Sequence, residues 1–155
     1  MTVTASREHT ICVGHRVVGQ GGKCEKLHGH NYTITFTAQG VRDATDQVGR
    51  VVDFSVLKSE LCQWLEENWD HKTLIWDQDP WLYESDGSFG YLNPDWVNHD
   101  DMGVVLVPFN PTAENMAHYL LNTVAPSTVL RRTFGVEIIS VKVQETPKCS
   151  AKVTI

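Results

Sequence analysis

No stretch of this 155-residue chain approaches the roughly 20 consecutive apolar residues that a membrane-spanning helix needs. The polar N-terminal segment, which includes Arg7 and Glu8, also lacks the apolar core of a signal peptide. We therefore expect a cytoplasmic location and no membrane partner.

The chain is also short of positive charge. Its 13 Lys and Arg residues are outnumbered by 19 Asp and Glu residues, which gives a formal net charge of −6. A nucleic-acid-binding protein needs a basic stripe along one face, so the charge balance argues against a nucleic-acid partner. A length of 155 residues is enough for one sizeable core, and we expect a single domain over residues 1–155.

Cysteine is scarce, and the four thiols form no Cys-x-x-Cys pair. They are Cys12, Cys24, Cys62 and Cys149. This spacing indicates reduced thiols rather than a disulfide framework. We expect three of them to be packing residues. Cys24 differs because it lies in a polar, glycine-rich loop between Lys23 and Lys26, whose positive charges would favour the thiolate. The alternative is an incidental loop thiol.

The sequence His28-Gly29-His30 begins a well-patterned strand. Downstream, the apolar residues Tyr32, Ile34, Phe36 and Ala38 alternate with threonines. His28 and His30 continue the apolar parity, so both imidazoles should leave the same face of the strand. Two residues along a strand span roughly 6.5 Å, which lets both side chains reach one metal ion. The alternative is a pair of satisfied polar residues at a strand start.

His15 is the best candidate for a third metal ligand. It ends an earlier run of period two, formed by Val3, Ala5, His9, Ile11, Val13 and His15. Antiparallel pairing of the two segments would bring His15 beside His28 and His30. A catalytic zinc site has three protein ligands and keeps a fourth position open for water or substrate.

Two helices are predicted from apolar residues that recur at helical spacing. The first has Asp53 as N-cap, followed by Phe54, Leu57, Leu61, Trp64 and Leu65. The second has Asn110 as cap and Pro111 at its first position, followed by Met116, Ala117, Leu120, Leu121 and Val124.

The remaining patterned segments predict strands at 104–109, 139–145 and 151–155. Glu145 shares the parity of Ile139, Val141 and Val143, where a carboxylate is costly unless it is paired. It therefore either lies past the buried edge or binds something. The order of elements predicts an α+β fold, with an antiparallel sheet that carries two helices on one face.

Residues 76–103 read as an irregular connection. Its three tryptophans, Trp76, Trp81 and Trp96, indicate that it folds onto the body or onto a neighbour. We interpret His99 and its acidic neighbours as part of a solvated loop rather than as a second metal site.

Six motifs, in order, carry a resemblance that spans residues 15–146. They are His15, Cys24-x-x-x-His28-Gly29-His30, Val51-Val52-Asp53-Phe54, Asp70-His71-Lys72-x-Leu74, Pro111-Thr112-x-Glu114-Asn115 and Val143-x-Glu145-Thr146. The set resembles the 6-pyruvoyl-tetrahydropterin synthase / 6-carboxy-5,6,7,8-tetrahydropterin synthase family. Val13-Gly14 departs from the family pattern, which usually has small pairs such as Ala-Ala before the first histidine.

The resemblance implies the tunnelling fold (T-fold), with an antiparallel four-stranded sheet and two helices on one face. It also implies that subunits join their sheets into a barrel. Family members assemble as homohexamers of two stacked trimers, with active sites at subunit interfaces.

The resemblance further implies a zinc-dependent lyase that acts on 7,8-dihydroneopterin triphosphate. By that analogy Zn²⁺ binds His15, His28 and His30, and Cys24 removes a carbon-bound proton. Asp70 and His71 relay protons, and Thr112 and Glu145 hold the pterin ring.

The three-residue spacer between Cys24 and His28 resembles the 6-carboxytetrahydropterin synthases of queuosine (7-deazaguanine) biosynthesis, which release acetaldehyde and triphosphate. Three alternatives stay open. They are a 6-pyruvoyl-tetrahydropterin synthase, an epimerase or aldolase acting on dihydroneopterin, and a non-enzymatic structural zinc or pterin-binding module. A structural site would be closed by four protein ligands.

Overall fold

A computed structural model describes residues 1–84, 86–95 and 102–155, so Trp96 and His99 lie outside the described residues. Its sheet has six strands in the order β4-β3-β1-β2-β5-β6. The strands are β1 (Thr4–His15), β2 (His28–Gly40), β3 (Lys72–Trp76), β4 (Val104–Val107), β5 (Val136–Thr146) and β6 (Cys149–Thr154). The expected α+β class is confirmed.

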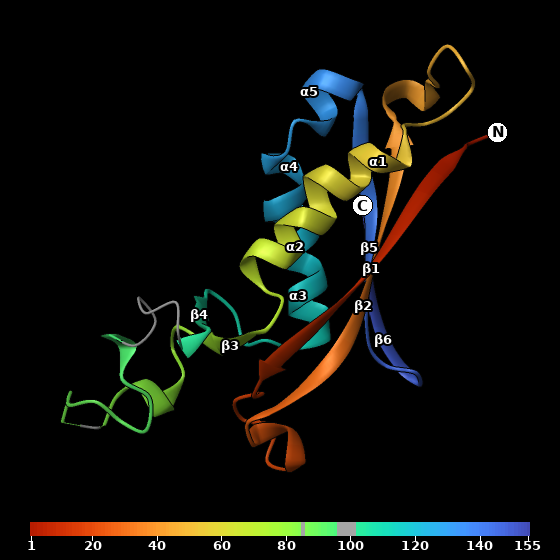
Figure 1. The fold of residues 1–155 in the computed structure, drawn as a ribbon. Helices are drawn as coiled ribbons and strands as arrows, with labels where there is room; N and C mark the ends of the chain where they lie inside the picture. The colour runs from red at the N-terminus through yellow and green to blue at the C-terminus, as the bar shows by residue number, and fades with distance from the viewer. Residues whose placement is uncertain (85, 96–101) are drawn as a thin grey trace.

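The helices lie on one side of this sheet (Figure 1). One continuous helical segment consists of α1 (Phe54–Leu57), η3 (Lys58–Cys62) and α2 (Gln63–Asn68). The other consists of α3 (Ala113–Tyr119), η7 (Leu120–Val124) and α4 (Ala125–Ser127), followed by the short α5 (Leu130–Phe134). Single 3-10 turns form η1 (Lys23–Glu25), η2 (Val41–Asp43) and η4 (Pro80–Leu82). None of the helices in the described part of the chain has the length and apolar character that a membrane crossing needs.

The strands β1, β2, β5 and β6 form an antiparallel sheet as expected, but the expected number of four strands is wrong because β3 and β4 extend the sheet. β3 pairs parallel to β1, and β4 pairs parallel to β3. β3 shows no period-two pattern, because both Leu74 and Ile75 are buried. A short apolar run without alternation is not distinguishable from other buried segments by its pattern.

The predicted pairing of the first two strands is confirmed. β1 and β2 run antiparallel, and His15 lies directly opposite His28. The inward face of this ribbon is fully buried at Ile11, Tyr32 and Ile34, where it meets the helices. The register that builds the core therefore also fixes the positions of the two histidines.

Strand β5 departs from the predicted parity at Ile139. Ala38 pairs with Ile138 whereas Thr37 pairs with Ser140, so Ile139 is an extra residue in a β-bulge. Ile138 is buried, and Ile139 is only half-buried. The hydrophobic pattern does not reveal this bulge, because the extra residue is apolar like the buried residue before it.

The second helix begins later than expected. Thr112, not Asn110, is the N-cap of α3, and its hydroxyl accepts a hydrogen bond from the Asn115 N–H at 3.2 Å. The Asn110 amide instead bonds the N–H and the carbonyl of Val18. The predicted cap at Asp53 is confirmed, since its carboxylate accepts from the Ser55 N–H.

The cysteine prediction is right about pairing and partly wrong about packing. All four thiols are free, but only Cys62 is buried, whereas Cys12 and Cys149 are exposed. Cys12 lies on the polar face of β1, with Glu8 and Thr10, whereas Cys149 is the exposed first residue of β6. In the 76–103 segment, Trp81 packs against Arg16, as expected for a segment that folds onto the body.

The bulge makes a paired prediction about stability. Ile138→Ala should lower the free energy of unfolding by about 2–5 kcal/mol, because it leaves a cavity in the core. Ile139→Ala should cost roughly 1 kcal/mol or less, because its side chain is the extra, half-buried residue. Urea denaturation of both variants measures the difference. Equal losses would mean that the strand is regular.

Candidate functional site

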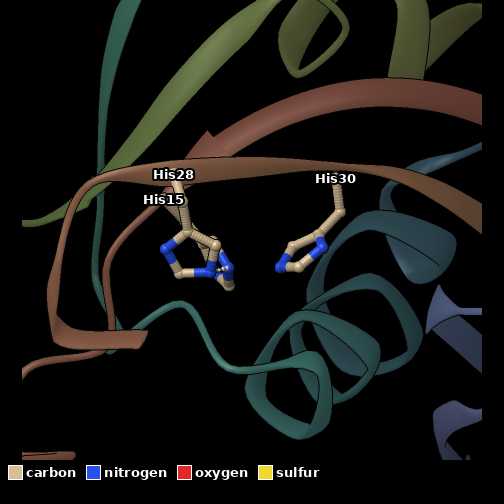
Figure 2. A group of neighbouring side chains, drawn as sticks. All are labelled: His15, His28 and His30. Carbon is tan, nitrogen blue, oxygen red and sulfur yellow. Dashed lines mark hydrogen bonds between the residues drawn. The ribbon is translucent and has the colours of Figure 1, made fainter. Parts of the chain in front are cut away.

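Three imidazoles converge at the end of the β1–β2 ribbon. His28 and His30 leave the same face of β2, and His15 reaches the same space from β1 (Figure 2). One ring nitrogen from each lies within 4.8 Å of the others. The ring centroids of His15 and His28 are 4.6 Å apart, and those of His28 and His30 are 4.9 Å apart. The expected grouping of the three residues is therefore present.

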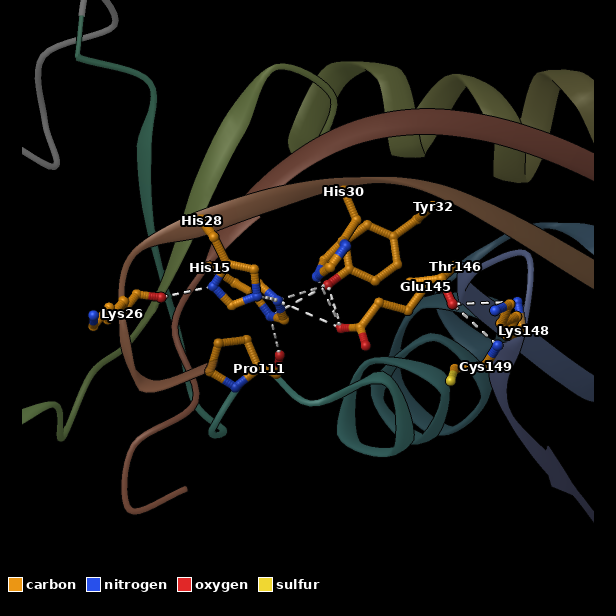
Figure 3. Close-up of polar contacts among 10 residues, drawn as sticks. All are labelled: His15, Lys26, His28, His30, Tyr32, Pro111, Glu145, Thr146, Lys148 and Cys149. Atoms are coloured by element: carbon orange, nitrogen blue, oxygen red, sulfur yellow. Dashed lines mark hydrogen bonds and ion pairs between the residues drawn. The ribbon is translucent and has the colours of Figure 1, made fainter. Parts of the chain in front are cut away.

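Backbone carbonyls fix the tautomers of two of these rings. His15 Nδ1 lies 2.6 Å from the Pro111 carbonyl oxygen, and His28 Nδ1 lies 2.6 Å from the Lys26 carbonyl oxygen (Figure 3). A carbonyl only accepts, so each Nδ1 carries the hydrogen and donates it. In the neutral rings, both Nε2 atoms therefore present lone pairs.

These two Nε2 atoms face each other at 3.1 Å. With both tautomers fixed, neither neutral ring has a hydrogen to place between them, and the contact is unfavourable unless a cation lies nearby. The Nε2 of His30 is buried as well and forms no hydrogen bond within the described residues. Three imidazole nitrogens, two of them on rings held by a backbone carbonyl at the far side, suit a zinc ion.

Burial favours the neutral form of His15 and of His30. Desolvation is the largest cause that lowers the pKa of His15 below its usual 6.5, and the neighbouring His28 and His30 lower it further. The pKa of His30 is lowered in the same way, although Glu145 opposes the shift. Neutral imidazole is the form that binds a metal.

Glu145 points from β5 toward this cluster (Figure 3). Its Oε1 lies 3.4 Å from His15 Nε2 and 3.5 Å from His30 Nε2. It also accepts a hydrogen bond from the Tyr32 hydroxyl at 3.2 Å. The carboxylate thus lies beside the site, with a quarter of its side chain exposed. Burial and the Glu145 charge raise the pKa of Tyr32, which stays a donor.

Cys24 lies close to this group but outside the set of metal-binding nitrogens. It is part of the 3-10 turn η1 and is half-buried. It lines a pocket of about 190 Å³ together with Thr112, Glu145 and Cys149. The pocket therefore joins the thiol to the carboxylate that touches two of the imidazoles.

Asp70 and His71 are not part of this pocket. They follow α2 and lie against Cys12, whose N–H donates to Asp70 Oδ1 at 2.8 Å. His71 Nδ1 is 3.0 Å from Asp70 Oδ2, and His71 is strongly exposed. His71 lines a different pocket of about 410 Å³, together with Asn31 and Lys72. Within one chain, the structure thus separates this pair from Cys24.

Sequence reasoning missed several contributors to the site. The carbonyls of Pro111 and Lys26 carry no side-chain signal, because any residue offers the same oxygen. The alternating pattern predicts Tyr32 as a core residue and does not reveal its hydroxyl contact with Glu145. The available signal is its position two residues after His30, on the same face of the strand.

Comparisons with known proteins agree with one another. A family profile described as 6-pyruvoyl tetrahydropterin synthase matches residues 4–155. The 6-carboxy-5,6,7,8-tetrahydropterin synthase of Rickettsia bellii is 32% identical over 97% of this chain and 99% of the relative. A solved protein from Wolinella succinogenes has a TM-score of 0.77 at 25% identity, over 99% of this chain and 98% of that one. The 6-pyruvoyltetrahydropterin synthase of Plasmodium vivax has a TM-score of 0.70 at 21% identity, over 100% and 99% of the chains.

The lowered pKa of His15 predicts how stability depends on pH. Unfolding returns the imidazole to a pKa near 6.5, so just below that pH the unfolded chain binds more protons than the folded one. In metal-free protein, the free energy of unfolding should fall as the pH drops from 7.5 to 5.5. His15→Gln should lose less over the same interval, as measured by urea denaturation at both pH values. Equal losses in parent and variant would contradict a buried neutral His15.

Proposed function

Because the chain belongs to the 6-pyruvoyl tetrahydropterin synthase family, we propose that it is a zinc-dependent lyase acting on 7,8-dihydroneopterin triphosphate. The products are 6-carboxy-5,6,7,8-tetrahydropterin, acetaldehyde and triphosphate. The observation that carries the proposal is the convergence of three imidazole nitrogens next to a pocket that contains Cys24 and Glu145. The fold is the tunnelling fold of this family, with six strands in its sheet.

His15, His28 and His30 would hold the zinc ion. When bound, the ion would polarise the side-chain hydroxyls of the substrate as a Lewis acid. Cys24 is not a member of the ligand group, which supports a site with an open fourth position over a closed structural one. This arrangement favours the enzyme over a structural zinc module.

Side chains of the protein remove the proton and bind the pterin ring. Cys24 removes the carbon-bound proton as a thiolate. Glu145 and Thr112 hold the pterin ring, since a carboxylate suits the adjacent N–H and amino donors of the ring. The Thr112 hydroxyl already caps α3, so it contributes from a fixed position at the helix start.

Asp70 and His71 relay protons. Although burial opposes the effect, hydrogen bonds from Cys12 and His71 hold the pKa of Asp70 below its usual range, and the ionised carboxylate orients the imidazole. Because this pair is separated from Cys24 within one chain, we assign it to the site of a neighbouring subunit in a homohexamer. The relay then completes the site across a subunit interface.

The choice of product rests on two supports. Three residues separate Cys24 from His28, as in the 6-carboxytetrahydropterin synthases, and the Rickettsia relative carries that name. We therefore place the reaction in cytoplasmic queuosine (7-deazaguanine) biosynthesis rather than with the 6-pyruvoyl enzymes.

Product analysis tests this proposal. Purified protein incubated with 7,8-dihydroneopterin triphosphate should yield 6-carboxytetrahydropterin and acetaldehyde in equal amounts. A 6-pyruvoyl product without acetaldehyde would identify the other branch of the family. Release of glycolaldehyde that still carries the triphosphate would instead indicate an aldolase, and an epimerised substrate would indicate an epimerase.

A pair of variants tests the division between ligand and base. His28→Ala should lose zinc and turnover together, because it removes one of three ligands. Cys24→Ala should keep the fold and one zinc per chain but lose turnover. Metal analysis and circular dichroism of both variants provide the measurement. Zinc loss in Cys24→Ala would move the thiol into the coordination sphere and support a closed site.

Glu145 makes a prediction that separates binding from stability. Glu145→Gln should weaken substrate binding by about two to four orders of magnitude, since two charge-assisted hydrogen bonds are lost. The variant should melt at or above the parent temperature, because its amide oxygen can still accept from Tyr32 and a partly buried charge is removed. Glu137→Gln, the same change elsewhere on β5, is the control for binding. Easy unfolding with normal binding would make Glu145 a structural partner.

A further inference from the structure

Arg16 is a buried arginine that directly follows the first histidine of the site. Only 5% of the residue is exposed, and its partner Asp79 is 1% exposed. The guanidinium forms a two-point contact, with Nε donating to Asp79 Oδ2 at 2.6 Å and Nη2 donating to Oδ1 at 2.9 Å. The partner belongs to the connection between β3 and β4, whose role the sequence left open. The pair therefore ties that connection to the end of β1.

The connection is shaped around this contact. Asp79 caps the turn η4, because its Oδ1 also accepts from the Trp81 N–H at 2.9 Å. The Trp81 ring then covers the guanidinium, whose carbon lies 3.8 Å from the ring centroid. Arg16 is thus held on its edge by a carboxylate and on its face by an aromatic ring.

The remaining nitrogen of Arg16 points to the loop that carries Cys24. Nη1 donates to the Glu25 carbonyl at 2.9 Å. The next residue along the chain, Val17, donates its N–H to the Cys24 carbonyl at 2.7 Å. Arg16 and Val17, the two residues that follow the end of β1, therefore bind the successive carbonyls of Glu25 and Cys24 in the turn η1.

Glu25 closes the loop from the other side. Its carboxylate accepts from the N–H groups of Gly19 and Gly21, at 2.7 and 3.2 Å. Both glycines have positive φ angles, so the loop itself has little intrinsic preference for one conformation. The loop is held instead by the hydrogen bonds of Glu25, Val17 and Arg16.

We propose that Arg16 is a positioning residue for Cys24 and that Asp79 and Trp81 hold Arg16 in place for this task. The β3–β4 connection thereby sets the position of the thiol, although none of its described residues lines the pocket around it. The proposal rests on the proposed function only in taking Cys24 as the base. Lysine cannot replace Arg16, because one ammonium cannot reproduce the planar fork to Asp79 and reach the Glu25 carbonyl as well.

The experiment uses Arg16→Lys and Asp79→Asn in the zinc-loaded protein. Both variants should keep one zinc per chain, because neither residue is a ligand. Their kcat should fall by about 10- to 100-fold with little change in KM, since a misplacement of about 1 Å at a reacting group costs on this order. A second readout, independent of turnover, is the rate at which iodoacetamide alkylates Cys24, followed by peptide mass spectrometry. It should rise about tenfold as the loop opens locally.

Two controls separate positioning from stability. Cys149 lines the same pocket from β6, so its alkylation rate in the same molecules should stay at the parent value. Leu61→Ala, a buried change in η3, should lower the melting temperature without changing kcat or Cys24 alkylation. If Arg16→Lys and Asp79→Asn only lower the melting temperature, as Leu61→Ala does, the proposal is overturned.

The design also distinguishes this proposal from the function it rests on. If Cys24→Ala retained turnover, Cys24 would not be the base and the proposed function would fail. The alkylation readout would still report whether Arg16 holds the loop. Unchanged Cys24 alkylation in both variants would overturn the positioning role even if turnover required the thiol.

Discussion

The site depends on two short hydrogen bonds from histidine Nδ1 atoms to backbone carbonyls. They are made by His15 to Pro111 and by His28 to Lys26, and both fix the ring as the Nδ1–H tautomer. Fixing the tautomers leaves two Nε2 lone pairs facing each other at 3.1 Å. A protein does not gain stability from such a contact alone. The antiparallel register of β1 and β2, enforced by their buried apolar residues, is what holds the two rings together.

The surroundings of the imidazoles also affect the repulsion between the two facing Nε2 lone pairs. Burial lowers the pKa of His15, so protonation of that ring is an unfavourable way to relieve the repulsion between the facing lone pairs. Glu145 supplies negative charge from a third strand and accepts from the Tyr32 hydroxyl, which burial keeps protonated. The cluster is therefore compatible with a divalent cation, and the partly exposed carboxylate lies beside both the cluster and the Cys24 pocket.

Much of this arrangement could be predicted from strand periodicity. The parity of His28 and His30 and the antiparallel partner His15 follow from apolar residues at every second position. β3 could not be predicted in this way, because it is short and buried at two successive residues, Leu74 and Ile75. The separation of Asp70 and His71 from Cys24 is a property of the tertiary structure. Sequence motifs give the order of these residues along the chain but not the distance between them in the folded protein.

The bulge at Ile139 sets which way Glu145 faces. Before it, even-numbered residues such as Ile138 point into the core, and after it the odd-numbered Val141 and Val143 do so. Glu145 continues the odd parity, and it is itself the extra residue of a second register shift, against β6, between Gln144 and Thr146. Without the extra residue at Ile139, position 145 would continue the other parity and face away from the histidines. The number of residues between Ile138 and Glu145 is thus fixed, because it decides which face of the sheet each side chain takes. A one-residue deletion within the bulge would leave either the core or the carboxylate on the wrong face, whereas variation in length should be tolerated only in the turns beyond the strand's ends.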